Sequence, residues 1–226
     1  MAELQSICVY CGSNTGSDPA FAAAARTLGR AMAEADVRLV YGGGSVGLMG
    51  ILARSVMQSG GKVTGIIPQF LKDREVMLKE VSDLVVTADM HERKRIMFER
   101  SDAFLALPGG IGTLEEVVEI MTWAQLDRHA KPVAIANISG FWEPLIALFK
   151  HMTEAGFLNK AFLGGHTDLP VQFIDRIEDA IPMLSAAVAA TPRSRLDEAS
   201  RARVMLREHQ RPVRGSRRGL RPRSSP

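Results

Sequence analysis

A glycine-rich stretch in the middle of the chain combines residue types that could bind phosphate. Pro108 to Glu116 reads PGGIGTLEE; it follows the apolar run Ala103–Leu107 and precedes a segment with helical periodicity. Glycines let successive backbone N–H groups turn toward one point, and a helix N-terminus adds free N–H groups and a partial positive charge. Together these features predict a phosphate-binding loop that needs no lysine.

Glu116, the last residue of this stretch, could play either of two roles. Thr113 and Glu116 have the T-x-x-E spacing of a capping box, in which each side chain accepts a hydrogen bond from the other residue's backbone N–H. A carboxylate beside a phosphate is repelled by the ligand, so one retained there would better serve the ribose or an attacking water. The spacing alone leaves both roles open.

Arg93, in the segment ADMHERKRIMFERSD, is the strongest candidate for a partner of this loop. Met90, Ile96 and Met97 lie three or four positions from Arg93, which places it on the apolar face of a predicted helix. A buried arginine requires an anionic partner. A structural salt bridge would meet that need, but a catalytic or phosphate-binding role is favoured because this helix precedes the strand that leads into the loop.

Two more glycine clusters follow strand-like runs, Cys11–Gly16 and Tyr41–Gly50. The second contains G-x-G-x-x-G, the spacing of a dinucleotide-binding loop, which is weak evidence by itself. An NAD site also needs an acidic residue at the end of the next strand, and the predicted strand VTGII is followed by no acid until Asp73. A redox enzyme therefore stays only as an alternative, and the glycines instead predict close approach of the backbone to a ligand.

Other chemistry finds little support in the sequence. Cys8 and Cys11 have C-x-x-C spacing, but Cys8 lies within a predicted strand, so the two side chains should face opposite sides of the sheet. The five histidines show no metal-ligand spacing, and no lysine stands in a context typical of a Schiff base. We expect neither a metal nor an organic cofactor.

Alternating strands and helices must position these residues. The strand-like runs are Ser6–Tyr10, Arg38–Tyr41, Val63–Ile67, Leu84–Thr87, Ala103–Leu107, Val133–Ala136 and, more weakly, Pro170–Phe173. The helical segments are Pro19–Ala35, Gly47–Ser59, His91–Arg100, Thr113–Asp127, Phe141–Ala155 and Ile174–Val188. This pattern predicts an α/β fold, a Rossmann-like doubly wound parallel sheet flanked by helices in a single domain over residues 1–190. Ligands of such sheets bind at the carboxyl ends of the strands, where every glycine cluster falls.

Charge and composition divide the chain in two. Residues 191–226 contain eleven arginines and three acidic residues, a balance of +8; the whole chain is +3, so residues 1–190 carry −5. The basic segment has few large apolar residues and is predicted to be disordered, without a specific nucleic-acid partner. No apolar run is long enough to cross a bilayer, and the N-terminus resembles no signal peptide, so we expect a cytoplasmic protein without a membrane partner.

The segments CVYCGSNTG, YGGGSVGLMG, DMHERK and PGGIGTLEEVVEIMTWAQL together resemble the Lonely Guy family, the cytokinin-activating phosphoribohydrolases. The resemblance covers roughly residues 5–185. It implies cleavage of the N-glycosidic bond of an adenine-type nucleoside 5′-monophosphate, giving the free base and ribose 5-phosphate. It also implies a homodimer with its sites near the interface. Two alternatives stay open: AMP as the main substrate, or a non-catalytic nucleotide-binding or carrier protein on the same fold.

The resemblance implies that Arg93 and Glu116 form the catalytic pair. The other expected substrate contacts are Ser13, Gly43, Gly44, Glu75, Met90, Lys94, Gly109, Gly110, Ile111, Gly112, Thr113, Leu114, Glu115 and Thr122. Plant relatives read PGGYGT where this chain has Ile111, a difference that bears on selectivity for the base and leaves phosphate binding unaffected.

Overall fold

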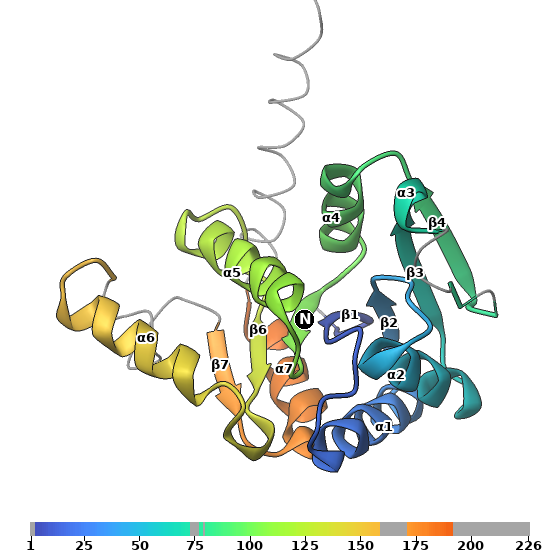
Figure 1. The fold of residues 1–226 in the computed structure, drawn as a ribbon, viewed down its shortest axis with the longest axis horizontal. Coiled ribbons are helices and arrows are strands. Elements are labelled where there is room, and N and C mark those ends of the chain that lie inside the picture. Colours follow the sequence, from blue (N-terminus) through green and yellow to red (C-terminus); the bar gives the residue numbers. More distant parts are fainter. Residues whose placement is uncertain (1–2, 73–76, 79, 159–170, 192–226) are drawn as a thin grey trace, which may run out of the picture.

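Seven parallel strands form the centre of the molecule (Figure 1). The computed structural model describes residues 3–72, 77–78, 80–158 and 171–191. The predicted contact residue Glu75 and all but the first residue of the predicted tail lie outside these ranges. The strands are β1 (Ser6–Tyr10), β2 (Arg38–Tyr41), β3 (Val63–Pro68), β4 (Asp83–Thr87), β5 (Ala103–Ala106), β6 (Val133–Ala136) and β7 (Val171–Ile174).

The strand order is β4-β3-β2-β1-β5-β6-β7. Strands β2 to β4 are therefore added on one side of β1, and β5 to β7 on the other. From β1 the chain builds outward to β4, then crosses back to place β5 on the other side of β1, with Ile7 beside Ala103. The crevice at such a reversal is where open α/β sheets bind ligands. The loops that follow β1 and β5 therefore meet at the expected binding edge.

Helices cover both faces of the sheet, as Figure 1 shows. One apolar cluster joins the sheet to helices on one face, and a second joins it to helices on the other. The first face carries α1 (Pro19–Glu34), α2 (Gly47–Gln58) and α7 (Ala180–Ala190); the second carries α4 (Met90–Glu99), α5 (Ile111–Gln125) and α6 (Glu143–Glu154). The short helix α3 (Gln69–Lys72) follows β3, and two 3-10 turns, Ile138–Gly140 and Ile177–Asp179, precede α6 and α7. Among the described residues, no helix combines the length and apolarity needed to cross a membrane.

The predicted fold class is confirmed, and the predicted strands match closely. The bounds of β1, β2 and β6 agree to the residue, and the weakly predicted last strand is present from Val171 onward. The helix predicted over Ile174–Val188 is wrong at its start, because Ile174 ends β7 and the helix begins at Ala180. Ile174 pairs with Ala136 of β6, so its position in the sheet outweighs the helical spacing of the apolar residues that follow.

Candidate functional site

The first two glycine clusters and the loop after β5 meet at the carboxyl edge of the sheet. The backbone N–H of Gly12 donates to the carbonyl oxygen of Pro108 at 3.1 Å, and the N–H of Leu48 donates to the carbonyl of Gly12 at 3.0 Å. A Cβ on Gly47 would overlap the backbone of Ser13, so the two loops can approach this closely only because residue 47 is a glycine. The prediction that the clusters share one edge of the sheet is confirmed.

The loop after β5 presents an open helix N-terminus. Helix α5 begins at Ile111 with Gly110 as its N-cap, and no side chain caps it. Gly110 and Gly112 are exposed, and a Cβ added to either would meet nothing within 4 Å. The N–H groups of a first helical turn have no partner within the helix. These N–H groups carry the partial positive charge that attracts phosphate, and the space beside Gly110 and Gly112 is open to a ligand.

Thr113 does not begin this helix, so of the two roles that the spacing left open for Glu116, the capping box with Thr113 is contradicted. Thr113 is the third helical residue, is 5% exposed, and lies against Gly109, where any Cβ would overlap its hydroxyl group. The N-cap position belongs to Gly110, whose lack of a side chain leaves the end of the helix uncovered. Glu116 is therefore free of a capping role.

Glu116 instead pairs with Arg93 of α4. The nearest atoms, Nη1 of Arg93 and Oε1 of Glu116, are 3.6 Å apart, and both side chains are largely buried. The predicted anionic partner of Arg93 is thus Glu116. Helix α4 is anchored by its N-cap Asp89, whose side chain accepts a hydrogen bond from the N–H of Glu92 at 2.8 Å. That anchor fixes the first turn from which Arg93 projects.

Three further contacts hold the guanidinium of Arg93 in place. Its Nε donates to the carbonyl oxygen of Ile66 in β3 at 3.2 Å, and its Nη1 lies 3.7 Å from the sulfur of Met90. Its Nη2 lies so close to Gly42 that a Cβ there would overlap it. Gly42 was not among the predicted site residues. The signal that could have identified it is its position as the first residue after β2 in a sheet whose ligands bind at that edge.

Burial raises the pKa of Glu116, and the adjacent Arg93 opposes that rise. The negative charges of Glu115 and Glu119 also raise the pKa, and Lys94 lowers it. A carboxylate with a raised pKa binds protons more readily than an ordinary glutamate does. Such a group is suited to accept a proton from water or to stabilise a cation in a site with little solvent.

Lys94 is held on the outer side of this pair. Its Nζ lies 2.7 Å from Oε1 of Glu115 and 3.1 Å from a carboxylate oxygen of Glu119. These bonds link α4 to α5 next to the Arg93–Glu116 pair. Thr122 lies farther along the exposed side of α5, where its hydroxyl donates to the carbonyl of Val118 at 2.7 Å.

The remaining predicted contacts fall on the same edge or on α5. Ser13 is exposed in the loop after β1, and Gly43 and Gly44 are buried after β2. Gly43 has a φ of +81°, which favours glycine, and its carbonyl accepts a hydrogen bond from the N–H of Leu78. Ile111 is 83% exposed at the mouth of the loop, followed by the half-buried Leu114.

The cysteines and acidic residues offer no metal centre in the described part of the chain. No group of three or more His, Cys, Asp or Glu residues there could hold a metal ion. Cys8 and Cys11 are buried free thiols that belong to the apolar clusters on opposite faces of the sheet, as predicted. Burial raises the pKa of both thiols, which keeps them protonated and unreactive.

Sequence comparison relates the chain to a group of curated proteins. A family described as "Possible lysine decarboxylase" matches residues 49–181. The chain is 48% identical to the probable cytokinin riboside 5′-monophosphate phosphoribohydrolase LOGL1 of Oryza sativa subsp. japonica, over 67% of this chain and 68% of that protein. It is 40% identical to the cytokinin riboside 5′-monophosphate phosphoribohydrolase LOG1 of Arabidopsis thaliana, over 80% of this chain and 86% of that protein.

Solved structures share the fold at lower sequence identity. The molybdenum cofactor carrier protein of Chlamydomonas reinhardtii is 21% identical with a TM-score of 0.60, covering 82% of this chain and 99% of its own. The molybdenum cofactor binding protein of Rippkaea orientalis is also 21% identical, with a TM-score of 0.59, covering 82% of this chain and 98% of its own. At this identity the likeness concerns the fold alone.

Proposed function

The chain belongs to the Lonely Guy family of cytokinin riboside 5′-monophosphate phosphoribohydrolases, and we propose on that premise that it hydrolyses the N-glycosidic bond of these nucleotides. The products are the free adenine-type base and ribose 5-phosphate. The observation that carries the proposal is the buried pair of Arg93 and Glu116 beside the open N-terminus of α5. A carboxylate with a raised pKa next to a phosphate-binding loop suits the cleavage of a glycosidic bond in a substrate that carries a 5′-phosphate.

The loop binds the 5′-phosphate in this proposal. The free N–H groups at the start of α5 donate to its oxygens, and the helix dipole adds attraction. Residues 109–115 supply this surface, and Lys94 borders it from the neighbouring helix, where it pairs with Glu115 and Glu119. Ser13, Gly43, Gly44, Glu75, Met90 and Thr122 complete the proposed substrate contacts.

Hydrolysis then exchanges one bond at C1′ for another. As the bond from C1′ to the base nitrogen breaks, the ribose gains positive charge, as in glycosidases generally. Glu116 stabilises that cation or accepts a proton from the water whose oxygen bonds to C1′. The departing base takes up a proton, and Arg93 orients Glu116 and the ligand. The site needs no metal or cofactor for these steps.

One experiment tests the function and separates its alternatives. The purified full-length protein is incubated with AMP and, separately, with isopentenyladenosine monophosphate, and free base and ribose 5-phosphate are measured. We expect release from both, with a higher kcat/KM for the cytokinin nucleotide. A higher kcat/KM for AMP would make AMP the main substrate. Binding of either nucleotide without release would contradict the enzyme and favour a carrier.

Gly42→Ala should lower kcat by about 10- to 100-fold while the protein stays folded. The new Cβ would displace the Arg93 guanidinium, and a small misplacement of a catalytic group costs rate on this scale. Gly42 lacks the positive φ that would strain an alanine. The check is steady-state kinetics with thermal unfolding. In an Arg93→Ala background the same substitution should cost little more; a full additional loss there would show that Gly42 acts by another route.

We also propose that the chain forms a homodimer through the exposed side of α5. Ile111 and Val118 on this helix and Leu126, its C-cap residue, are large apolar residues that are 83%, 38% and 64% exposed. Such a row of exposed apolar side chains on a helix is typical of an interaction surface. Ile111 also lies at the mouth of the phosphate-binding loop, so a partner packed against it would lie near the active site. A cytoplasmic location stays a prediction from the sequence.

Leu126→Asp should weaken the dimer by about 100-fold or more, because a carboxylate would have to be buried in an apolar contact. Sedimentation velocity over a range of concentrations measures the dissociation constant. Leu148→Asp is the matched control, since Leu148 is 46% exposed on α6, on a different helix. A wild-type monomer, or equal effects of the two substitutions, would rule out α5 as the interface.

A further inference from the structure

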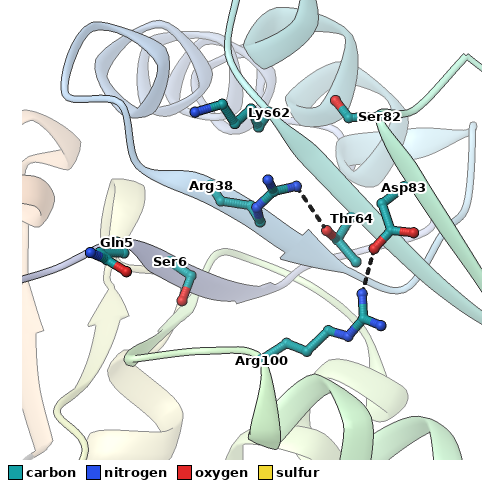
Figure 2. A pocket seen from close by; sticks show the side chains of 8 residues that line it. All are labelled: Gln5, Ser6, Arg38, Lys62, Thr64, Ser82, Asp83 and Arg100. Carbon is teal, nitrogen blue, oxygen red and sulfur yellow. Dashed lines mark hydrogen bonds and ion pairs between the residues drawn. The ribbon is translucent and has the colours of Figure 1, made fainter.

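A pocket lies at the edge of the sheet where the strands begin, opposite the proposed active site. Its volume is about 660 Å³, within the range of small-molecule sites. Figure 2 shows side chains from the beginnings of several strands and Arg100 at the end of α4 facing this space. Arg38 is the first residue of β2 and Asp83 the first of β4, whereas the catalytic loops follow the strands' other ends. The pocket therefore shares no residue with the proposed active site.

The charge of this pocket is mainly positive. Three cationic side chains, Arg38, Lys62 and Arg100, line it together with a single carboxylate, that of Asp83. Asp83 pairs with Arg100, and Lys62 pairs at 3.1 Å with the highly exposed Asp36 outside the lining. These carboxylates leave one cation without a counter-charge.

Arg38 is that cation. Within the described part of the chain it forms no ion pair, and its one side-chain hydrogen bond runs from Nη1 to the hydroxyl of Thr64 at 3.3 Å. A guanidinium carries five N–H donors in a planar fork. Most of the donors of Arg38 are therefore available to a ligand in the pocket, as its orientation in Figure 2 illustrates.

Two hydroxyl groups in the lining, those of Thr64 and Ser82, are also able to donate. The oxygen of Thr64 accepts the bond from Arg38, and the oxygen of Ser82 accepts one from the N–H of Val63 at 3.1 Å. Neither hydroxyl donates to another described residue. Each oxygen accepts one hydrogen bond, and its proton stays available, so each hydroxyl group can donate to an anion in the pocket.

We propose that this pocket is a second anion site that binds a phosphoryl group, apart from the phosphate of the substrate. The guanidinium of Arg38 contacts two phosphoryl oxygens, since its fork matches phosphate geometry. Thr64 and Ser82 donate to the remaining oxygens, and Lys62 adds charge from the rim.

Protein NMR with ¹⁵N-labelled full-length protein tests the proposal, because it reports the two phosphate sites separately. Inorganic phosphate and ribose 5-phosphate are titrated in parallel at constant ionic strength. We expect amide signals of the pocket, such as those of Thr64 and Ser82, to follow a binding curve distinct from that of Gly110 in the catalytic loop. The two ligands distinguish free phosphate from a phosphate monoester by which one binds the pocket more tightly.

Arg38→Gln should weaken binding at the pocket by about tenfold or more and leave the curve of Gly110 unchanged. Arg30→Gln is the matched control, because Arg30 also donates to a threonine hydroxyl but is exposed on α1, outside the lining. Lys62→Gln, at an exposed position, provides a second variant if Arg38→Gln does not fold. Pocket signals that fail to respond to either ligand, respond equally to chloride, or respond alike in Arg38→Gln and Arg30→Gln would overturn the proposal.

Discussion

Glu116→Gln should reduce the rate of base release from isopentenyladenosine monophosphate by about 10²- to 10⁴-fold, the range typical of a lost general base. Glutamine keeps the size of the side chain but can neither accept a proton from water nor offset positive charge on the ribose. The pair with Arg93 at 3.6 Å holds this residue next to the loop, so the substitution changes the chemistry more than the shape of the site. Single-turnover assays of base and ribose 5-phosphate measure the effect.

Nucleotide binding distinguishes a chemical role of Glu116 from a structural one. The dissociation constant for AMP, from calorimetry, should change by less than about tenfold in Glu116→Gln, because the phosphate is bound by backbone N–H groups of the loop. Glu119→Gln is the matched control: Glu119 lies on the same helix and pairs with Lys94. Near wild-type turnover in Glu116→Gln, or an equal loss in Glu119→Gln, would refute the catalytic assignment.

The strands were predictable because their apolar runs are continuous. β1, β5 and β6 are buried along their whole length, as strands covered on both faces must be, and such runs stand out in the sequence. Helix ends were less predictable, since α5 begins two residues before the predicted Thr113. Its N-cap is a glycine without a capping side chain, so the usual sequence signal for a helix start is missing.

The parts of the candidate site that lie within one segment were predictable from the sequence. The contacts between segments that are distant in the sequence were less predictable. The phosphate-binding loop after β5 could be inferred from its own amino-acid sequence. The bonds from Lys94 to Glu115 and Glu119 join two helices across more than twenty positions, and no local spacing reveals them. The overlap that a Cβ on Gly42 would make with Arg93 is equally hidden. The pocket at the opposite edge of the sheet is harder still to predict from the sequence. Its residues come one or two at a time from segments that lie far apart in the chain.

Burial of the Arg93–Glu116 pair costs free energy, so folding stability alone does not explain why the pair is buried. Removing two charges from water is unfavourable, and replacing such a pair by apolar residues often stabilises a protein. The raised pKa of Glu116 is a direct sign of that cost, since burial is its largest cause. Between the ordinary glutamate pKa and this raised value, the folded state loses stability as the pH increases. The burial of this pair therefore fits the proposed catalytic role better than a role in folding.

Arg93→Gln should lower kcat/KM by at least about 100-fold at neutral pH and shift its acid limb to higher pH. Arg93 lowers the pKa of Glu116, so its loss lets burial raise that pKa further. A smaller fraction of Glu116 is then ionised at any given pH, and activity should recover partly as the pH increases. A kcat/KM profile between pH 5 and 9, with AMP binding measured alongside, tests this expectation.

Arg93→Lys separates the charge of Arg93 from its geometry. Lysine keeps the positive charge, so the acid limb should move less than in Arg93→Gln. Its single ammonium group cannot reproduce the planar fork that contacts Ile66, Met90 and Glu116 together, so kcat should still fall substantially. If both variants lose activity equally with no change in the pH profile, Arg93 only maintains the structure, and Glu116 would have to act without it.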